Sequence, residues 1–192
     1  MLGLLVFSGF TLNLVLHGAL GIGNIAEWQK RSHPIPLFQL GILFVSVFLL
    51  WMLASYGLVF LAFGFLEYAL LFPLSALVCM GLEGLCARLL PSLVPEYNVF
   101  NPATAYDGLA LSSLMMTLHI ARTVMEALIL SLGFSLGTLL SMGLLNEIRK
   151  RSSLELVPPF MQGRPLMLIS MGLLSLLFTA LGLIFFNALG IF

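Results

Sequence analysis

The chain of 192 residues is 60% hydrophobic and only 8% charged, and its eight Lys and Arg residues balance eight Asp and Glu residues. Soluble domains usually carry about 25% charged residues, so this composition predicts an all-α integral membrane protein rather than a water-soluble domain. The zero net charge and the lack of a basic face exclude a general attraction to nucleic acid.

Six apolar stretches predict six transmembrane helices, because crossing a bilayer core takes about 20 apolar residues in a helix. The first starts at the N-terminus, without the positive region or the cleavage site of a signal peptide, and is interpreted as a membrane span. The expected spans are Leu2–Ile22, Pro36–Phe65 and Glu67–Leu89 with a reversal at Gly57–Gly64, then Thr104–His119, Val124–Leu145 and Leu166–Ile191.

Breaks are expected inside the first and fourth spans. The first contains the glycine-rich stretch Gly18–Gly23 directly after Asn13 and His17, and the fourth is short and polar at both ends. Irregular backbone in a bilayer needs protein or water around it, and membrane proteins build midplane sites beside such interruptions. Asn13, His17 and Asn24 are therefore candidates for a polar midplane site or ion path. A hydrogen bond from His17 to a neighbouring helix explains that histidine equally well.

Positive charges predict the orientation of the chain, because loops kept on the cytoplasmic side carry an excess of Lys and Arg. The odd-numbered loops hold seven cations, whereas the even-numbered loops and the termini hold one, Arg122. Both termini are therefore expected to lie outside the cytoplasm. One of the seven, Arg88, can pair with Glu83 at the inner interface. The other six are interpreted first as topology anchors: Lys30, Arg31, Arg149, Lys150, Arg151 and Arg164.

Three further polar residues lie between the fourth and fifth spans. His119, Arg122 and Glu126 have the spacing i, i+3 and i+7, which places them on one helical face if the helix is continuous there. They are candidates for an ion relay in which Glu126 neutralises Arg122. The alternative interpretation places them at the outer headgroup level, where polar residues cost little.

The remaining polar residues point to packing rather than to chemistry. Cys79 and Cys86 are about 10 Å apart along one helix, which is too far for both to hold one small cluster, and they are expected to be core residues. No catalytic triad, Walker loop, dinucleotide fingerprint or zinc-ligand spacing occurs, so no catalytic residue or metal site is predicted. Serines with neighbouring glycines favour close helix packing in lipid, at Ser131, Ser135, Ser141, Ser170 and Ser175.

Three stretches carry a resemblance to a known family. They read "FLEYALLFPLSALVCMGLEGLCARLLP" from Phe65, "LSLGFSLGTLLSMGLL" from Leu130, and the basic loop "NEIRKRSSLELVPPFMQGRP" from Asn146 with the apolar helix after it. Together they resemble the membrane subunits RnfA of Rnf electron-transport complexes and NqrE of sodium-translocating NADH:quinone reductases. The resemblance covers most of residues 37–90 and 124–190.

The resemblance implies a single membrane domain over residues 1–192, made of two inverted three-helix repeats at about 1–90 and 100–192. It implies a subunit without an active site of its own, in a bacterial or archaeal cytoplasmic-membrane complex that couples electron transfer to sodium or proton transport. The implied partners are a sister six-helix subunit, flavin-bearing membrane subunits and a cytoplasmic dehydrogenase subunit.

The chain departs from the family at the two cysteines that are thought to hold an iron–sulfur cluster. Gly23 stands at the first cysteine position, followed by Asn24, and Thr104 or Ala105 stands at the second. Because none of these residues offers a thiolate, the chain is expected to be a divergent member that binds no cofactor alone. Flavin and iron–sulfur centres are then expected in partner subunits. The alternative function is a stand-alone inverted-repeat transporter of a small solute.

Overall fold

The structure of this chain is a computed structural model that describes residues 2–18, 20, 37–57, 65–89, 108–152, 158 and 164–188. The described part is helical and contains no β-strand, in agreement with the all-α prediction. Its elements are α1 (Leu2–Val6), the π-helical turn η1 (Phe7–Thr11), α2 (Leu14–Gly18), α4 (Leu37–Met52), the π-helical turn η2 (Leu53–Gly57), α5 (Phe65–Leu89), α7 (Leu109–Ile120), α8 (Val124–Ser152) and α9 (Arg164–Ala188).

Three stretches of helix are long and apolar enough to cross a membrane, namely Leu40–Gly57, Val124–Ile148 and Pro165–Ala188. Shorter apolar helical stretches occur in the other three predicted spans, at Gly3–Gly18, Leu70–Cys86 and Leu109–Ile120. The 12 residues of α7 rise only about 18 Å, against a hydrocarbon core of about 30 Å. These apolar helices support a membrane-embedded protein.

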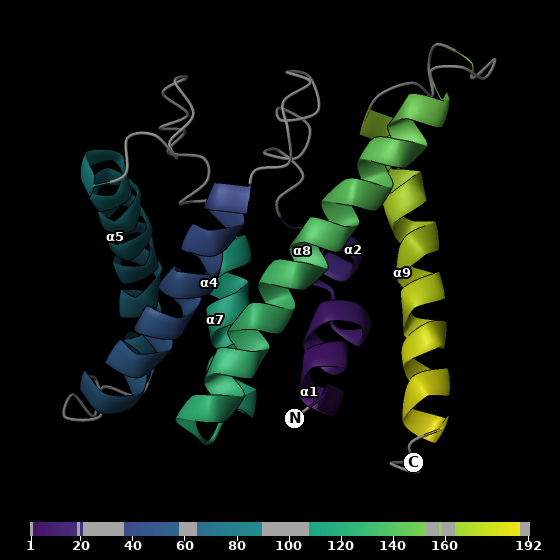
Figure 1. The fold of residues 1–192 in the computed structure, drawn as a ribbon. Helices are drawn as coiled ribbons and strands as arrows, with labels where there is room; N and C mark the ends of the chain where they lie inside the picture. The colour runs from purple at the N-terminus through teal and green to yellow at the C-terminus, as the bar shows by residue number, and fades with distance from the viewer. Residues whose placement is uncertain are drawn as a thin grey trace.

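Helices α4 and α8 pack against each other at the centre of the molecule, with α5 and α9 on opposite sides of them (Figure 1). Helix α8 also contacts the broken first helix, made of α1, η1 and α2, as well as α7 and α9. Helix α5 packs on α4 and α7, whereas α9 packs on α8, η1 and α2.

These contacts keep the same pattern when the two halves of the chain are exchanged. The broken first helix packs on α8, and α7 packs on α4. Helix α9 packs on α8 and the broken helix, and α5 packs on α4 and α7. The broken helix begins at the end of the molecule where α7 finishes, so the two halves run in opposite directions (Figure 1).

The two larger apolar clusters of the described residues lie in the interior between these helices. One joins α4, α5, α7 and α8 around Leu50, Leu71, Leu114 and Leu130, all of them fully buried. The other joins α2, α8 and α9, and its members are Val15, Leu16, Met142, Leu145, Met171 and Phe178. Between the clusters, the first helix lies directly against α8.

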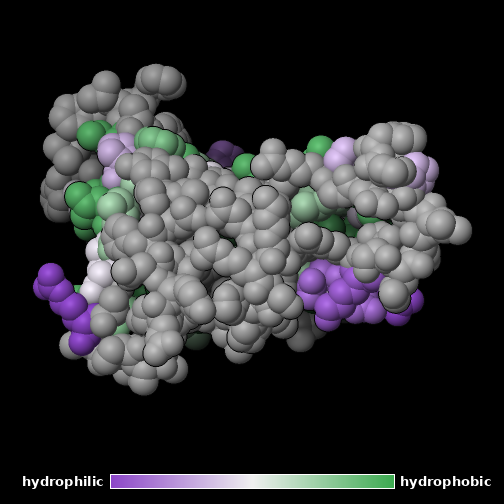
Figure 2. Space-filling model, turned by 90° about the horizontal axis from the view of Figure 1, so that it is seen from above, coloured by the Kyte–Doolittle hydropathy of each residue, from purple (hydrophilic) through white to green (hydrophobic). Residues whose placement is uncertain are grey.

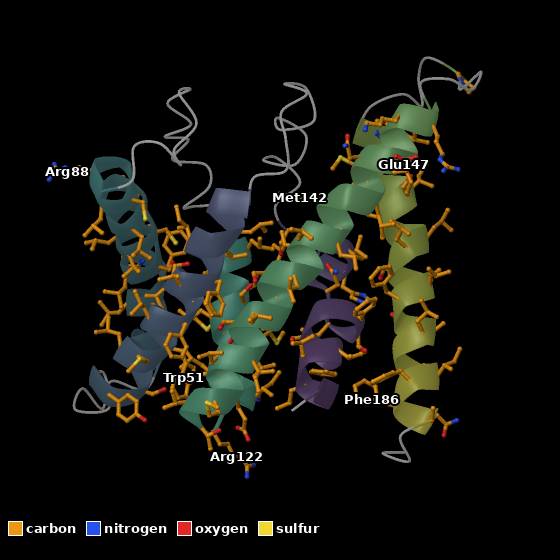
Figure 3. The ribbon with its side chains drawn as sticks, viewed as in Figure 1. Trp51, Arg88, Arg122, Met142, Glu147 and Phe186 are labelled. Carbon is orange, nitrogen blue, oxygen red and sulfur yellow. The ribbon has the colours of Figure 1, made fainter. Side chains whose placement is uncertain are left out.

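Charged residues gather at the ends of the helices. Arg88 and Glu147 lie at one end of the molecule and Arg122 at the other (Figure 3). Arg151 is exposed beside Glu147, with 3.1 Å between Nε and Oε1. Figure 2 looks onto this end, and strongly hydrophilic residues cover the tips of α5 and α8 there. Both chain termini are marked at the opposite end in Figure 1.

Among the predicted topology anchors, Lys150 and Arg151 are exposed at the tip of α8. Lys30 and Arg31 lie outside the described residues, as do the side chains of Arg149 and Arg164.

Candidate functional site

The first apolar helix is interrupted at Leu12 and Asn13. The π-helical turn closes with the Leu12 amide donating to the Phe7 carbonyl over 2.7 Å. Leu12 then leaves the helical region, with φ −108° and ψ 41°, and α2 begins at Leu14. The expected interruption at Gly18–Gly23 lies largely outside the described residues, and the break at Leu12 and Asn13 lies within the same predicted span, before those glycines.

Asn13 fills this break and is only 1% exposed. Its Nδ2 donates to the Gly9 carbonyl at 3.1 Å and to the Gly137 carbonyl of α8 at 3.0 Å. Its Oδ1 accepts from the Leu16 amide at 3.3 Å and from the Ser141 hydroxyl at 3.0 Å. A carboxamide offers two donors and two acceptor positions, so every one of them is used. Asn13 therefore caps α2 and ties both half-helices to α8.

Glycines allow this close approach between the first helix and α8. A Cβ atom at Gly137 would lie 2.7 Å from the Gly9 carbonyl oxygen, and one at Gly133 would collide with the Ser8 hydroxyl. Small residues four apart let membrane helices pack with their backbones nearly touching. The contact brings the Gly137 carbonyl within reach of Asn13. We name the set Gly9, Asn13, Gly133, Gly137 and Ser141 the Asn13 junction.

The Asn13 junction lies at mid-depth of the apolar helices. Gly137 is near the middle of the membrane-length stretch Val124–Ile148. Buried backbone that leaves a helix at such a depth must satisfy its polar groups within the protein, because lipid offers no partners. The Asn13 side chain supplies a donor for the Gly9 carbonyl, which in a regular helix would accept from a backbone amide.

His17 lies one helical turn beyond Asn13 and is exposed. Its Nδ1 is 2.6 Å from the hydroxyl of Ser175, which is near the middle of the stretch Pro165–Ala188 in α9. The hydrogen bond to a neighbouring helix, one of the two interpretations of His17, is therefore present. Its assignment to an ion path stays a prediction. Asn24 lies outside the described residues.

Thr11 is another polar residue of the first helix that faces a neighbouring helix. Its hydroxyl is buried without a hydrogen-bond partner among the described residues, and it contacts Gly182 of α9. Buried hydroxyls normally have a hydrogen-bond partner. On the side of the broken helix that faces α9, the Thr11 hydroxyl therefore has an unmet hydrogen-bonding capacity among the described residues.

The helix is not continuous between His119 and Glu126, so the condition for their shared helical face is not met. Helix α7 ends at Ile120, and Ala121 is extended. Glu126 Oε2 accepts from the Arg122 amide at 2.8 Å and from the Thr123 amide at 3.2 Å. The Thr123 hydroxyl in turn accepts from the Glu126 amide at 3.3 Å. This reciprocal pair is a capping box at the start of α8.

The side chains of His119 and Arg122 are exposed near this turn, and Arg122 lies at the tip of the molecule (Figure 3). Their role as an ion relay stays a prediction.

The five predicted packing serines differ in whether they reach another helix. Ser131, Ser135 and Ser170 donate to carbonyls of their own helices. Ser141 lies within hydrogen-bond distance of both the Gly137 carbonyl of its own helix and Asn13, and Ser175 contacts His17. From the sequence, all five were expected alike to favour close packing. The signal that distinguishes Ser141 is its register with Gly133 and Gly137, four residues apart on one face of α8.

Cysteines are poorly placed for a cluster. Cys79 is buried against Ala76 and Ala110, as expected for a core residue, and Cys86 is half-buried on the same helix. Gly23, Thr104 and Ala105 lie outside the described residues and carry no thiol. The described part contains no group of three or more His, Cys, Asp or Glu side chains that could hold a metal ion. The residues at the family cysteine positions therefore do not fit an iron–sulfur cluster.

We compared the sequence with models of protein families and with curated proteins. No model of a protein family and no curated protein matches the sequence.

Proposed function

We propose that this chain is a membrane subunit of an ion-translocating oxidoreductase of the Rnf and Nqr type. In this proposal it contributes to the ion path and carries no redox centre of its own. The observation that carries the proposal is the Asn13 junction, where a helix is broken at mid-depth and Asn13 makes two hydrogen bonds to α8. Discontinuous helices of this kind form the midplane sites of ion-coupled membrane proteins.

The proposed architecture has six membrane crossings in two inverted repeats, at about residues 1–90 and 100–192. The exchange of helix contacts between the two halves of the chain supports this arrangement. So does their opposite direction, because a two-fold axis in the membrane plane reverses each helix. Helix α7 would then be the counterpart of the broken first helix.

The proposed orientation puts the end with Arg88, Lys150 and Arg151 in the cytoplasm and both termini outside. It is supported by the separation of these cations from Arg122, at the opposite end. Such an asymmetry is how positive charge orients multi-pass proteins in a bacterial or archaeal cytoplasmic membrane.

The proposed partners are a sister six-helix subunit, flavin-bearing membrane subunits and a cytoplasmic dehydrogenase, with flavin and iron–sulfur centres in those chains. Large apolar side chains on the outer faces of α5 and α9 support burial in lipid or against other subunits. Leu77 is 67% exposed and Leu176 is 70% exposed. The class of partner is proposed from the sequence resemblance, and the exposed apolar faces of α5 and α9 are surfaces on which such partners could pack.

Purification of the tagged chain from its native membrane in a mild detergent tests the proposal. We expect a flavoprotein and an iron–sulfur protein to be retained in a stable complex, with flavin and iron measured in the peak. A double variant, Cys79→Ala with Cys86→Ala, should leave the iron content unchanged. Recovery of the chain without any flavoprotein or iron–sulfur protein would overturn the proposal.

A stand-alone transporter of a small solute is the second candidate. The Asn13 junction serves this function equally, because discontinuous helices also form the midplane sites of secondary transporters. That function predicts solute flux in liposomes that contain the purified chain alone. Flux without partners, together with the absence of redox proteins in the purification, would replace the first proposal by this one.

A further inference from the structure

We propose that His17 is a proton-binding site at mid-depth of the protein and shares a hydrogen-bonded proton with Ser175. The inference rests on the proposed function, because it names the proton as the ion that the broken helix handles. It is carried by the contact between the His17 ring and Ser175, at the middle of α9.

In the described part of the chain, His17 is separated from other ionisable groups. Helix α2 packs against α7, α8 and α9, and in these helices the ionisable side chains lie near the ends. They are His119 on α7, Glu126, Glu147, Arg149, Lys150 and Arg151 on α8, and Arg164 on α9. The segments α1 and η1 carry none. An ionisable residue at this depth is costly and is by default a functional residue.

The ring can bind a proton without breaking its contact. Nδ1 and the Ser175 hydroxyl are 2.6 Å apart, and Nε2 makes no hydrogen bond with any described residue. In the neutral tautomer that carries hydrogen on Nδ1, this N–H donates to the Ser175 oxygen, and the Nε2 lone pair is open. One added proton on Nε2 gives an imidazolium in which Ser175 still accepts. The charge of the ring rises by one, and release of either proton restores the neutral ring.

Polar groups continue from this contact along the seam between α9 and the broken helix. On α9, Ser175, Thr179 and Gly182 have the spacing i, i+4 and i+7, and therefore share one face. Thr179 donates its hydroxyl to the Ser175 carbonyl at 2.8 Å. Beside Gly182 lies the buried Thr11 hydroxyl, which has no partner among the described residues. The seam between α9 and the broken helix therefore carries hydroxyl groups from the His17 contact to Thr11.

The site can be tested by NMR on the whole chain in lipid nanodiscs, with ¹⁵N in histidine only. The chain has three histidines, so His17→Gln assigns the signal of interest. On acidification of the sample, we expect both ring nitrogens of His17 to move to the shifts of an imidazolium. His119, exposed at the end of α7, serves as the reference in the same sample.

Ser175→Ala supplies the second readout. We expect it to shift the Nδ1 signal of His17 and to leave His119 unchanged, whereas Ser175→Thr should restore the wild-type signal. Should Ser175→Ala fail to fold, the Ser175→Thr and wild-type titrations still decide the question. A His17 ring that stays neutral at pH 5 while His119 is protonated would overturn the inference. So would a His17 spectrum that is the same with and without the Ser175 hydroxyl.

The outcome is independent of redox partners, because the titration uses the isolated chain. If the chain lacks flavoprotein partners but His17 is protonated, the proposed complex is wrong and the proton site stands. If the chain retains its partners but His17 stays neutral, the proposed complex stands and the proton site is wrong.

Discussion

The described helices of the two halves make a similar pattern of contacts, but the side chains at those contacts differ. Where the broken first helix crosses α8, Gly9 and Gly137 touch, and Asn13 donates to a carbonyl of the other helix. Where α7 crosses α4, the interior holds Leu114 and Trp51.

Hydroxyls of α7 are satisfied within their own helix. Thr117 donates to the Ser113 carbonyl at 2.7 Å, and Ser113 donates to the Leu109 carbonyl at the same distance. The contacts of α9 and α5 with these helices differ in the same way. Helix α9 meets α2 through Ser175 and His17, whereas α5 meets α7 through Ala76, Cys79 and Ala110.

The contact between α7 and α4 shows that helices of this fold can pack without polar contacts between them. Membrane helices associate through packing and close backbone approach, and a hydrogen bond between them adds about 0.6 kcal/mol on average. The α7 side achieves the same packing with apolar side chains. The polar groups at the Asn13 junction are therefore there because the helix is broken.

The largest expected effect comes from filling the glycine contact. Gly137→Leu places a side chain where even a Cβ would lie 2.7 Å from the backbone oxygen of Gly9. Overpacking against backbone that cannot move away costs about 3 kcal/mol. Unfolding by sodium dodecyl sulfate in mixed micelles, followed by circular dichroism, measures the loss.

Gly143→Leu on the same helix is the matched control, because a Cβ there meets no atom within 4 Å. We expect it to change the free energy of unfolding by less than about 0.5 kcal/mol. Equal losses in the two variants would contradict the close contact at Gly137.

The next effect comes from removing the carboxamide. Asn13→Leu leaves the buried carbonyl of Gly9 without its side-chain donor, and it removes one donor from the carbonyl of Gly137, which still accepts from the Ser141 hydroxyl at 2.9 Å; this should cost about 2 kcal/mol. Thr117→Val, in the other half, removes a hydroxyl that bonds only within α7, and should cost less than about 1 kcal/mol. The same unfolding titration compares them. A loss from Thr117→Val as large as that from Asn13→Leu would remove the difference between the halves.

A smaller effect is expected at the turn between α7 and α8. Thr123→Ala removes the hydroxyl that accepts from the Glu126 amide, and loss of such a cap costs about 1 kcal/mol. Hydrogen exchange should accelerate in the first turn of α8 and stay unchanged around Asn13. Met125→Ala, at a position that is 62% exposed, is the control. Faster exchange at both places would indicate that the capping box also holds the Asn13 junction.

The smallest effect is expected for Ser175→Ala. Its hydroxyl meets an exposed His17, so its loss should cost about 0.6 kcal/mol, the average for a hydrogen bond between membrane helices. Ser170→Ala, which removes a hydroxyl bonded within α9, is the comparison in the same titration. A loss above about 2 kcal/mol from Ser175→Ala would mean that this contact, too, is structural.

Helix positions could be predicted from the sequence because charges and glycines punctuate the apolar runs. The fifth span was expected to begin at Val124, where α8 begins, and the third to end at Leu89, where α5 ends. The fifth span was expected to end at Leu145, but helix α8 does not end there. It runs on to Ser152, since the basic residues after Ile148 are good helix formers and extend the helix beyond its apolar part.

The break at Leu12 and Asn13 could not be placed from local sequence. Asn13 was identified as a polar residue, but its partners Gly137 and Ser141 are far away in the chain. The position of the break depends on the approach of Gly9 to α8, which is a tertiary contact. His119, Arg122 and Glu126 failed to share a face for a local reason, because Thr123 and Glu126 form a cap that starts a new helix.

A double-mutant cycle between Asn13→Ala and Ser141→Ala tests most directly whether a side chain in the break holds the first helix on α8. Because Ser141 donates to Asn13 Oδ1, the two losses should be coupled by about 0.6 kcal/mol or more. Ser113→Ala with Thr117→Val, whose contact involves only a backbone carbonyl, should be additive within about 0.3 kcal/mol. Additive losses for Asn13 and Ser141 as well would contradict the account.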